Sequence, residues 1–462
     1  MACAKRAAGY GKKVAVIEKN RVGGTCVNVG CMPKKIMYNA ASIREKIYLA
    51  EDYGYKTTEQ LDWFTLKQRR DEYSLFGIVN CSYIKRLNGM HARALSNNHV
   101  EYFEGFGHFV APHQVQVGEG VILESDHILI ATGDKPLMPS FPGSEYCGSS
   151  DSFWHLESLP KRSLVIGGGY IAVEMAGILN ALGSDTFLAC RKDTPLRTYD
   201  PFITSILMDE MKKSGISVFD NSIIDRIEKG ENGSYSCYFQ NGKDIHNVDY
   251  ILMAAGRVPL LENLGLDIAG VQTDKGFVVV NDKEETTAPG VYCLGDNIGK
   301  VDLTPVAIQA GRRLADRLFN NQVDSIMDYT NVPSVVFSHP PIGTVGLTEP
   351  EARKIYGDDI KIFTSTFSNS LYALSPAEKK VKTGMKIVCQ LSTLKVLGVH
   401  IIGDSADEIL QGFAVAVKMG ATKVTFFYKN SFVEGLGCLC GDSSYCCRRA
   451  CHFWTLGPVL IC

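Results

Sequence analysis

The sequence feature that most limits the possible folds lies between Ser163 and Ser184, where the chain reads SLVIGGGYIAVEMAGILNALGS. An apolar run leads into the glycines at 167–169 and then into a helix-forming stretch of small and apolar residues. A glycine string alone often marks only a tight turn. Between a strand and a helix, however, it forms the G-x-G-x-x-A pattern, in which the pyrophosphate of a dinucleotide rests on the start of the helix. The pattern predicts an α/β domain with a parallel sheet that binds a dinucleotide.

The residues beyond the next predicted strand indicate which dinucleotide this domain binds. A site for NAD usually holds an acidic residue there, which binds the ribose 2′-hydroxyl. In this chain the strand TFLAC (186–190) is followed by Arg191, and Arg197 comes six residues later. Each arginine by itself is more simply explained as a solvated surface charge. Two guanidinium groups together at this place favour a 2′-phosphate, and so NADPH over NADH.

Other parts of the chain repeat the alternation of strands and helices. The run KKVAVIE (12–18) suits a buried parallel strand, and residues 2–10 before it predict the end of a helix. A further strand is expected at VYCLGD (291–296), with a helix over 305–319. Alternating segments over 385–403 then precede a helix over 407–421. We therefore expect two nucleotide-binding modules in one chain.

Composition excludes several classes of protein. At 462 residues and 50.7 kDa the chain is too long for one core, so we expect about three domains of ~100–200 residues. Lys and Arg number 48 against 50 Asp and Glu, and this balance does not suit a nucleic-acid binder. Apolar runs fall short of the ~20 residues needed to span a membrane. Nine of the 15 cysteines lie in residues 1–423 and six lie in the last 39.

The strongest chemical signal is GGTCVNVGCMPKK, over Gly23–Lys35. Cys26 and Cys31 flank a turn, and Cys31 stands at the entry to a predicted helix. The partial positive charge of a helix N-terminus, together with nearby lysines, stabilises a thiolate. Two unrelated buried thiols or half of a zinc site are the alternatives, but no second Cys or His pair lies nearby to complete a zinc site. The pattern favours a redox-active dithiol.

The stretch GGTCVNVGC followed by PKK resembles the active-site segment of the flavoprotein pyridine nucleotide-disulfide oxidoreductases. GYIAVE with the two later arginines, SHPPIGTVGLTEPEA (338–352) and DEILQGFAVAVKMGATK (407–423) extend the resemblance over nearly all of residues 1–423. The resemblance implies an α/β fold with two Rossmann-like modules, for FAD and NADPH, and a C-terminal α+β dimerisation domain. It also implies a homodimer.

The resemblance assigns roles to individual residues. Cys26 is expected to exchange with the disulfide substrate and Cys31 to face the flavin. Lys34 is expected near the flavin ring, paired with Glu174. The expected FAD-binding residues are Glu18, Thr25, Gly107, Gly133, Asp296 and Thr304; those for NADPH are Gly167, Gly168, Gly169, Ile171, Glu174, Arg191, Arg197, Gly256 and Val335. No metal is expected.

The activity that the resemblance implies is NADPH-dependent reduction of glutathione disulfide to glutathione, through FAD and a Cys26–Cys31 disulfide. A variant or fragment of such an enzyme without catalytic activity is one alternative. Another is a relative that acts on thioredoxin, trypanothione or dihydrolipoamide, the last of which Arg191 and Arg197 disfavour. We expect no nucleic-acid or membrane partner, and a cytoplasmic location with a mitochondrial form as the alternative.

The resemblance also suggests domain bounds and departures from the family. We expect an FAD domain over 1–141, an NADPH domain over 142–257, a central part of the FAD domain over 258–329 and an interface domain over 330–423. In the first domain the family's initial strand and glycine loop are expected to be missing, and residues 74–83 to be an insert. The tail over 424–462 lacks the family's His-Pro acid/base. Its cysteines suggest accidental composition first, a metal site second and a redox tail third.

Overall fold

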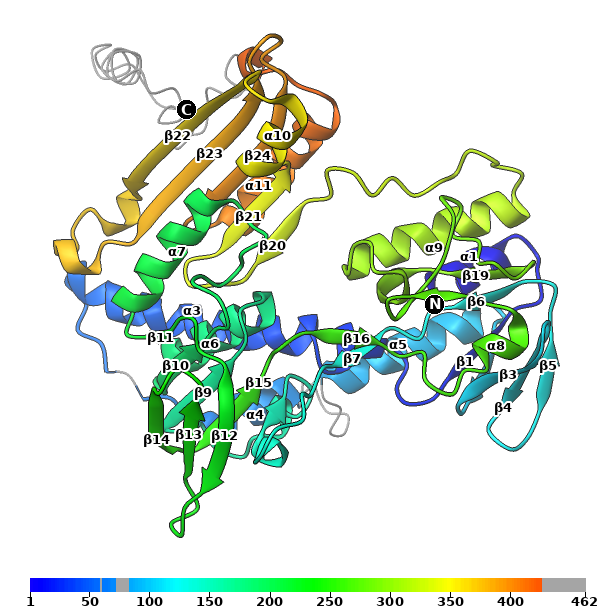
Figure 1. The fold of residues 1–462 in the computed structure, drawn as a ribbon, viewed down its shortest axis with the longest axis horizontal. Coiled ribbons are helices and arrows are strands. Elements are labelled where there is room, and N and C mark those ends of the chain that lie inside the picture. The colour runs from blue at the N-terminus through cyan, green and yellow to red at the C-terminus, as the bar shows by residue number, and fades with distance from the viewer. Residues whose placement is uncertain (59, 72–82, 426–462) are drawn as a thin grey trace, which may run out of the picture. The chain divides into compact units, whose positions relative to one another are not determined.

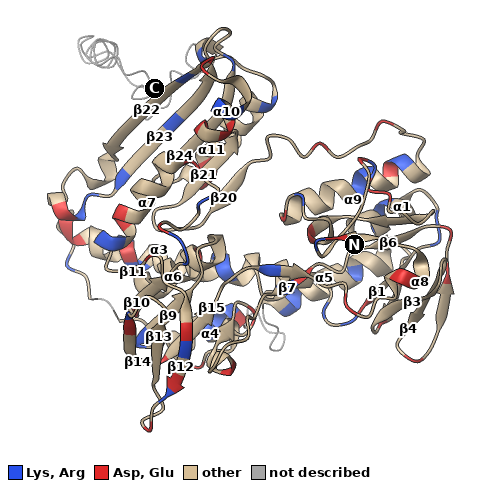
Figure 2. Ribbon diagram, viewed as in Figure 1, with Lys and Arg blue, Asp and Glu red and all other residues tan. Residues whose placement is uncertain are grey.

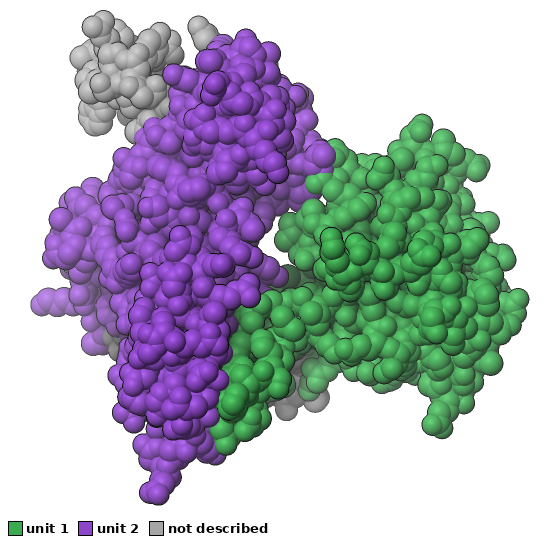
Figure 3. All heavy atoms as spheres, in the orientation of Figure 1, with its two compact units in different colours: residues 1–39, 60–159, 252–329 green, residues 40–59, 160–251, 330–462 purple. Residues whose placement is uncertain are grey.

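The computed structural model describes residues 1–58, 60–71 and 83–425. The chain divides into two compact units (Figure 3). Unit 1 contains residues 1–39, 60–159 and 252–329, and unit 2 contains 40–59, 160–251 and the residues from 330 onward. The expected insert, except its last residue Tyr83, and nearly all of the expected tail lie outside the described residues. Each unit is therefore built from several separate stretches of the chain.

Unit 1 holds the first part of the fold and the central strands (Figure 1). Its helices are α1 (Ala2–Gly9), α2 (Gly24–Asn28), the start of α3 (Cys31–Asp52), α4 (Trp63–Asp71), α5 (Tyr83–Asn97), α8 (Leu266–Ala269) and α9 (Thr304–Phe319). Its strands are β1 (Ala15–Glu18), β2 (Glu101–Glu104), β3 (Gly107–Ala111), β4 (Gln114–Val117), β5 (Ile122–Glu124), β6 (Ile128–Ile130), β7 (Asp134–Pro136), β8 (Gly148–Ser149), β16 (Arg257–Pro259), β17 (Thr273–Asp274), β18 (Phe277–Val278) and β19 (Val291–Cys293).

The strands of unit 1 form short sheets rather than one wide sheet. β1 pairs with β2 in parallel, and β19 pairs with β6 in parallel. β3, β4 and β5 form an antiparallel meander, and β7 pairs with β16. Phe109, Ile130, Val291 and Cys293 are buried together in one core, so the meander and the β6–β19 pair share a hydrophobic centre. Burial of these apolar side chains stabilises this part of the unit.

The first helix is held by side chains as well as by packing. α1 packs on α9, where Cys3 lies against Gly311. Arg6 forms a two-point ion pair with Asp316 of α9, with its Nε 2.6 Å from Oδ1. The Tyr10 hydroxyl donates to the same carboxylate at 2.6 Å. The predicted helix over 2–10 is confirmed.

Unit 2 contains a parallel sheet and a long antiparallel sheet (Figure 1). Its helices are the end of α3, α6 (Tyr170–Leu182), α7 (Pro201–Lys213), α10 (Glu349–Tyr356) and α11 (Ala406–Lys418). Its strands are β9 (Arg162–Ile166), β10 (Asp185–Ala189), β11 (Ser217–Phe219), β12 (Ile224–Lys229), β13 (Tyr235–Phe239), β14 (Asp244–Val248), β15 (Tyr250–Met253, whose last two residues fall in unit 1), β20 (Ser334–Val336), β21 (Ile342–Gly346), β22 (Ile360–Ser368), β23 (Lys382–Gln390) and β24 (Val396–Ile402).

The sheets of unit 2 follow the two patterns that the sequence predicts. β10 pairs in parallel with both β9 and β11, and α6 packs on β9 and β10. The C-terminal part is a five-stranded antiparallel sheet in the order β20-β21-β24-β23-β22, covered by α11. Ile387, Val399, Ile401, Leu410 and Phe413 are buried between this sheet and α11. The predicted α/β class with a C-terminal α+β part is confirmed.

Several predicted bounds shift by a few residues. The strand predicted over 12–18 begins only at Ala15. The helix predicted at Cys31 begins at Cys31 itself, and Pro33 lies in its first turn, which proline fits. The helix predicted over 407–421 ends at Lys418, and Gly420 follows with a left-handed φ of 71°. That conformation suits the glycine that follows a helix end.

Charged residues of both signs are mixed over the elements of each unit (Figure 2). This mixing agrees with the formal net charge of −2. Among the helices of the described residues, none has the length and apolar character needed to cross a membrane.

Candidate redox site and dinucleotide loop

The redox loop, residues Gly23–Lys35 of unit 1, joins a short helix to a long one. Cys26 lies within α2, and Cys31 is the first residue of α3. The Val29 N–H donates to the Thr25 carbonyl at 2.9 Å and closes α2. A Cβ atom on Gly30 would lie 2.9 Å from the Thr25 oxygen and 3.2 Å from the Cys26 Cα. The chain therefore needs glycine at position 30 to bring the two cysteines together.

The two sulfur atoms form one hydrogen-bonded pair. The Cys31 thiol and the Cys26 sulfur hydrogen-bond to each other, and the Thr304 hydroxyl at the start of α9 hydrogen-bonds to both. The hydrogen bond from the Cys31 side chain is the main cause that lowers the pKa of Cys26 to about 6, against an ordinary value of 9.0. The Cys31 backbone N–H and the Lys34 charge lower this pKa further.

The pKa of Cys31 moves in the opposite direction. Its hydrogen bond to Cys26 raises the pKa of Cys31 above the ordinary value. The sequence led us to expect the thiolate at the helix start, where Cys31 lies. In the reduced pair the hydrogen bond between the sulfurs extends this expectation to Cys26, because the thiol of Cys31 can donate to a thiolate on Cys26. One proton is thus shared by the two sulfurs.

Three side chains from outside the redox loop hold it in place. The Trp154 indole Nε1–H donates to the Val29 carbonyl at 2.8 Å. The Asn88 amide of α5 donates to the Val22 carbonyl at 2.5 Å and to Asn28 Oδ1 at 3.0 Å. Thr304 contacts the sulfurs, as described above. Sequence reasoning missed Trp154 and Asn88, which lie 125 and 66 positions away from their backbone partners.

Gly133 and Asp296 lie at the ends of the neighbouring strands β6 and β19 in unit 1. Gly133 has a left-handed φ of 71°, and its N–H and C=O both bond to the Asn297 amide, at 3.1 and 2.8 Å. Asn297 is fully buried, and we did not predict it. Asn297 follows Asp296 directly, so the sequence Gly-Asp-Asn was the signal from which this residue could have been predicted. Its amide fixes the loop after β6 beside Asp296.

Asp296 has the chemistry of a site for a polyhydroxyl ligand. Burial raises the pKa of Asp296 to about 6, and the charges of Asp134 and Asp302 act in the same direction. Within residues 1–58, 60–71 and 83–425, no donor forms a hydrogen bond to this carboxylate. A half-buried carboxylate without a protein donor suits the hydroxyls of a ribityl or ribose group. The carboxylate oxygens of Asp296, which accept hydrogen bonds, therefore fit the hydroxyl groups of FAD.

The other residues expected at the FAD site also lie in unit 1. Glu18 ends β1, and its carboxylate accepts from the Asn20 N–H at 2.9 Å. Thr25 lies in α2, beside Cys26. Gly107 begins β3, and a Cβ there would lie 3.2 Å from the Ile17 side chain. Each of these residues is placed in the same unit as the redox pair.

The dinucleotide loop, Gly167–Gly169 of unit 2, lies between β9 and α6, as predicted. Gly167 has a positive φ of 150°, and the Gly168 carbonyl accepts from the Leu196 N–H at 2.7 Å. A Cβ atom on Gly169 would meet nothing within 4 Å. The loop is therefore open at the start of α6, where a pyrophosphate would lie. Ile171 is the second residue of α6.

The two arginines follow β10 on the segment that is bonded to the dinucleotide loop. Arg191 and Arg197 are both exposed. Between them, the Leu196 N–H ties the segment to Gly168. The segment ends at Asp200, which is fully buried and bonds to Lys386 of β23 at 2.9 Å. The arginine side chains are exposed, while the backbone that carries them is bonded to Gly168 and ends at the buried Asp200.

Glu174, Val335 and Gly256 complete the residues predicted for NADPH. Glu174 in α6 is buried and accepts from the Phe337 N–H at 2.9 Å. Val335 lies in β20, beside this contact. Gly256 lies between β15 and β16, within unit 1, and its carbonyl accepts from Leu137. Lys34 lies in α3 within unit 1 and Glu174 within unit 2, so their pairing stays a prediction.

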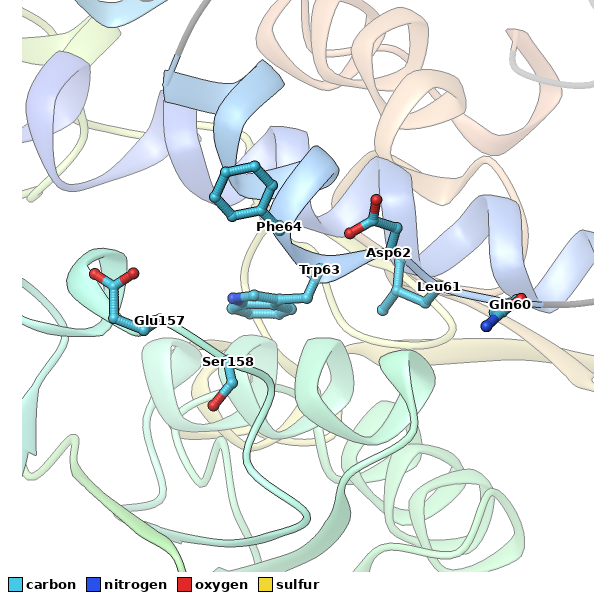
Figure 4. Close-up of a pocket in the computed structure, with 7 residues that line it drawn as sticks. All are labelled: Gln60, Leu61, Asp62, Trp63, Phe64, Glu157 and Ser158. Atoms are coloured by element: carbon cyan, nitrogen blue, oxygen red, sulfur yellow. The ribbon is translucent and has the colours of Figure 1, made fainter.

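A separate cavity of about 620 Å³ lies at the start of α4 in unit 1 (Figure 4). Its lining consists of Gln60, Leu61, Asp62, Trp63, Phe64, Glu157 and Ser158. The Trp63 indole donates to the Leu156 carbonyl at 3.4 Å, and Lys67 pairs with Glu157 at 2.7 Å. None of the residues predicted for catalysis or cofactor binding lines this cavity, so it is distinct from the redox loop.

A reactive cysteine pair and an open glycine loop, each on its own unit, define a pyridine nucleotide-dependent disulfide oxidoreductase. The family model for pyridine nucleotide-disulphide oxidoreductases matches residues 1–311, and the model for the dimerisation domain of that family matches residues 332–433. The chain belongs to this family. It is 44% identical over 438 residues to glutathione reductase of Schizosaccharomyces pombe (strain 972 / ATCC 24843). That alignment covers 92% of each chain.

Proposed function

We infer that this protein reduces glutathione disulfide to two glutathione molecules with electrons from NADPH. The observation that carries this function is the hydrogen-bonded pair in which the pKa of Cys26 is lowered to about 6. A thiol with that pKa is largely ionised at neutral pH, and the thiolate is the form that attacks disulfides. The 44% identity over nearly the whole chain to a glutathione reductase supports the same substrate.

The reduced pair accounts for the exchange steps with balanced atoms and electrons. The Cys26 thiolate attacks one sulfur of glutathione disulfide, forms a mixed disulfide and releases the first glutathione as a thiolate. The Cys31 proton passes to that thiolate through solvent. The Cys31 thiolate then attacks the Cys26 sulfur and releases the second glutathione, which takes its proton from water. The products are two glutathiones and an oxidised Cys26–Cys31 disulfide, which needs two electrons to return to the dithiol.

FAD, when bound, supplies two-electron transfer between NADPH and the cysteine disulfide. We propose that Glu18 and Asp296 bind its hydroxyl groups, that Thr25, Gly107 and Gly133 line its path, and that Thr304 orients the sulfur pair beside it. The raised pKa of Asp296 supports this assignment, because a carboxylate in a buried position gains from hydroxyl donors. Cys26, Cys31, Lys34 and Glu174 are the proposed catalytic set.

NADPH is proposed to bind at the dinucleotide loop of unit 2. The pyrophosphate would rest on the start of α6 beside Gly167, Gly168, Gly169 and Ile171. Arg191 and Arg197 would hold the 2′-phosphate by charge-assisted hydrogen bonds. Their exposure and the fixed backbone of their segment support this role. Glu174, Gly256 and Val335 would complete the site.

The chain forms a homodimer through the domain that matches the dimerisation family. We propose the domain bounds 1–141, 142–257, 258–329 and 330–423, with 424–462 as a tail. We also propose a cytoplasmic location. The non-catalytic alternative and the other family substrates are not favoured by the similarity to a glutathione reductase.

Steady-state turnover tests this function directly. The full chain would be purified with FAD and assayed with glutathione disulfide and either NADPH or NADH. We expect oxidation of NADPH that depends on glutathione disulfide, with two thiols formed for each NADPH consumed. Oxidised thioredoxin, trypanothione and lipoamide serve as competing substrates. A preparation that carries flavin but reduces one of these in place of glutathione disulfide would contradict the proposed substrate.

A further inference from the structure

The peptide between Val29 and Gly30 lies between the two cysteines, and a distant tryptophan holds it. The Trp154 indole Nε1–H donates to the Val29 carbonyl at 2.8 Å. The Val29 N–H is used within α2, and the Gly30 carbonyl accepts from Lys34 at 3.0 Å, in the first turn of α3. The indole therefore fixes the last peptide before the chain turns into α3, at a point that belongs to neither helix.

The Trp154 side chain is itself rigidly placed. It is 7% exposed, and the Phe153 ring packs edge-on against it with ring centroids 5.0 Å apart. Arg70 of α4 lies over the indole ring at 5.7 Å and donates from its Nη2 to the Trp154 carbonyl at 2.8 Å. Arg70 is 3% exposed and forms a two-point bond with Asp71. An indole packed against Phe153 and Arg70 and held through its backbone gives a donor of fixed direction.

The Val29–Gly30 peptide joins the end of α2, which carries Cys26, to the start of α3 at Cys31. The following peptide is fixed at the start of α3, because its Gly30 carbonyl accepts from the Lys34 N–H at 3.0 Å. Gly30 separates the two peptides, and glycine allows rotation that other residues resist. Without a donor on the Val29 carbonyl, the Val29–Gly30 peptide can turn toward solvent donors, and Cys26 in α2 can shift relative to Cys31 in α3. A buried donor that removes this freedom therefore acts on the reacting atoms through the backbone.

We propose that Trp154 is a positioning residue for the redox pair: its indole N–H holds the Val29–Gly30 peptide so that α2 and α3 keep Cys26 beside Cys31. The proposal rests on the function given above and adds a residue to it. Trp154 touches no reacting atom, so its effect is on the ionisation of Cys26 and on the ease with which the pair exchanges electrons.

In the test, the full chain is reduced with dithiothreitol and treated with iodoacetamide across pH 4.5–9. Peptide mass mapping then measures the alkylation of Cys26 at each pH. In the unmodified protein, alkylation of Cys26 is expected to be half-maximal near pH 6. In Trp154→Phe, which keeps an aromatic ring but loses the donor, the midpoint is expected to rise by roughly one pH unit, since one hydrogen bond to the thiolate is weakened.

Trp63→Phe is the matched control. Trp63 is 9% exposed and donates its indole N–H to the Leu156 carbonyl, two residues from Trp154, without contact to the redox loop. In Trp63→Phe the alkylation midpoint of Cys26 is expected to stay at the value of the unmodified protein. Equal shifts of the midpoint in the two variants would overturn the proposal, because the loss of any indole would then act through general stability. No shift in Trp154→Phe would also overturn it, because the indole N–H would then have no effect on the redox pair.

A second probe keeps the shape of the side chain. 3-Benzothienylalanine at position 154 replaces the ring N–H by sulfur and leaves the size of the ring system nearly unchanged, so it tests the hydrogen bond even where Trp154→Phe folds poorly. It is expected to raise the midpoint as Trp154→Phe does, and an unchanged midpoint would overturn the proposal. An alkylation midpoint near pH 9 in the unmodified protein would instead show that the pKa of Cys26 is not lowered, and so would contradict the proposed function itself.

Discussion

The redox loop of unit 1 and the dinucleotide loop of unit 2 both depend on glycine, but for opposite reasons. At Gly30 a Cβ would collide with the loop's own backbone, 2.9 Å from the Thr25 oxygen. At Gly169 a Cβ would meet nothing within 4 Å. The first glycine allows the chain to close on itself, and the second keeps space open for a ligand. Similar glycine-rich sequences can therefore serve internal packing or external binding, and only the surrounding atoms distinguish the two.

The two loops also differ in what holds them. Neutral donors fix the redox loop, from the Trp154 indole and the Asn88 amide. The segment after the dinucleotide loop ends instead in a buried ion pair between Asp200 and Lys386. Neutral donors near the sulfurs leave the charge of the thiolate to be set by Cys31, Thr304 and Lys34. In unit 2 the buried charges lie away from the exposed arginines, which stay available for a ligand.

The largest expected effect is loss of the nucleophile. Cys26→Ser should lower kcat for glutathione disulfide reduction by at least about 10³-fold, the scale on which removal of a reacting group acts. Serine at this position is not ionised at neutral pH and cannot form the mixed disulfide. Cys147→Ser is the control, because burial raises the pKa of Cys147 to about 12 and keeps it a thiol. Turnover that survives in Cys26→Ser would show that the redox loop is not the reacting site.

The buried ion pair of unit 2 should have the next largest effect. Lys386→Met leaves the Asp200 carboxylate buried without its cation, which typically costs about 3–5 kcal/mol. Lys386 is 4% exposed and also bonds to Glu349 at 2.6 Å. Lys382→Met on the same strand removes only an exposed pair with Asp209 and should cost about 0–1 kcal/mol. Calorimetric unfolding measures both, and equal losses would contradict the contrast.

Loss of the arginines should weaken NADPH binding without affecting the redox loop. Arg191→Ala and Arg197→Ala should each raise the KM for NADPH by about 10- to 150-fold, the effect of one lost hydrogen bond to a charged group. The KM for NADH should change little, because NADH has no 2′-phosphate. Lys192→Ala, an exposed neighbour, is the control. If the KM for NADPH and the KM for NADH rise together, the arginines act on something other than the 2′-phosphate.

The smallest expected effects come from the two glycines compared above. Gly30→Ala should lower the stability of the protein by about 1–3 kcal/mol, the usual cost of overpacking, and raise the alkylation midpoint of Cys26. Gly169→Ala should lower stability by about 1 kcal/mol, because alanine is a poorer helix N-cap than glycine but its Cβ would meet no atom within 4 Å. It should instead raise the KM for NADPH. Thermal unfolding and steady-state kinetics separate these results, and a reversed order would invalidate the comparison.

Much of the fold could be predicted from local patterns. The helices α1, α6, α9 and α11 and the strand β10 lie where the sequence predicts them, within a few residues. These elements have apolar periodicity or flanking glycines, which are local signals. The short paired strands of unit 1 were harder to delimit, because β1 and β6 have only four and three residues. Strand bounds depend on partners that lie far away in the chain.

The candidate site was only partly predictable. The cysteine pair and the glycine loop follow from spacing and residue type. Trp154, Asn88 and Asn297 were not predicted, because their partners lie 60 or more positions away. The opposite pKa shifts of Cys26 and Cys31 were not predicted either, since they depend on the hydrogen bond between the two sulfurs.

The sequence by itself determined which chemistry the chain can perform, because thiols, glycines and guanidinium groups at fixed spacings carry their reactivity wherever the chain places them. Only the tertiary structure decided which groups shift the pKa of each cysteine and what holds the peptide between the cysteines. The physical reason is that a pKa and a backbone direction depend on hydrogen bonds a few ångströms long. The groups that form these bonds come from segments that meet only when the chain has folded.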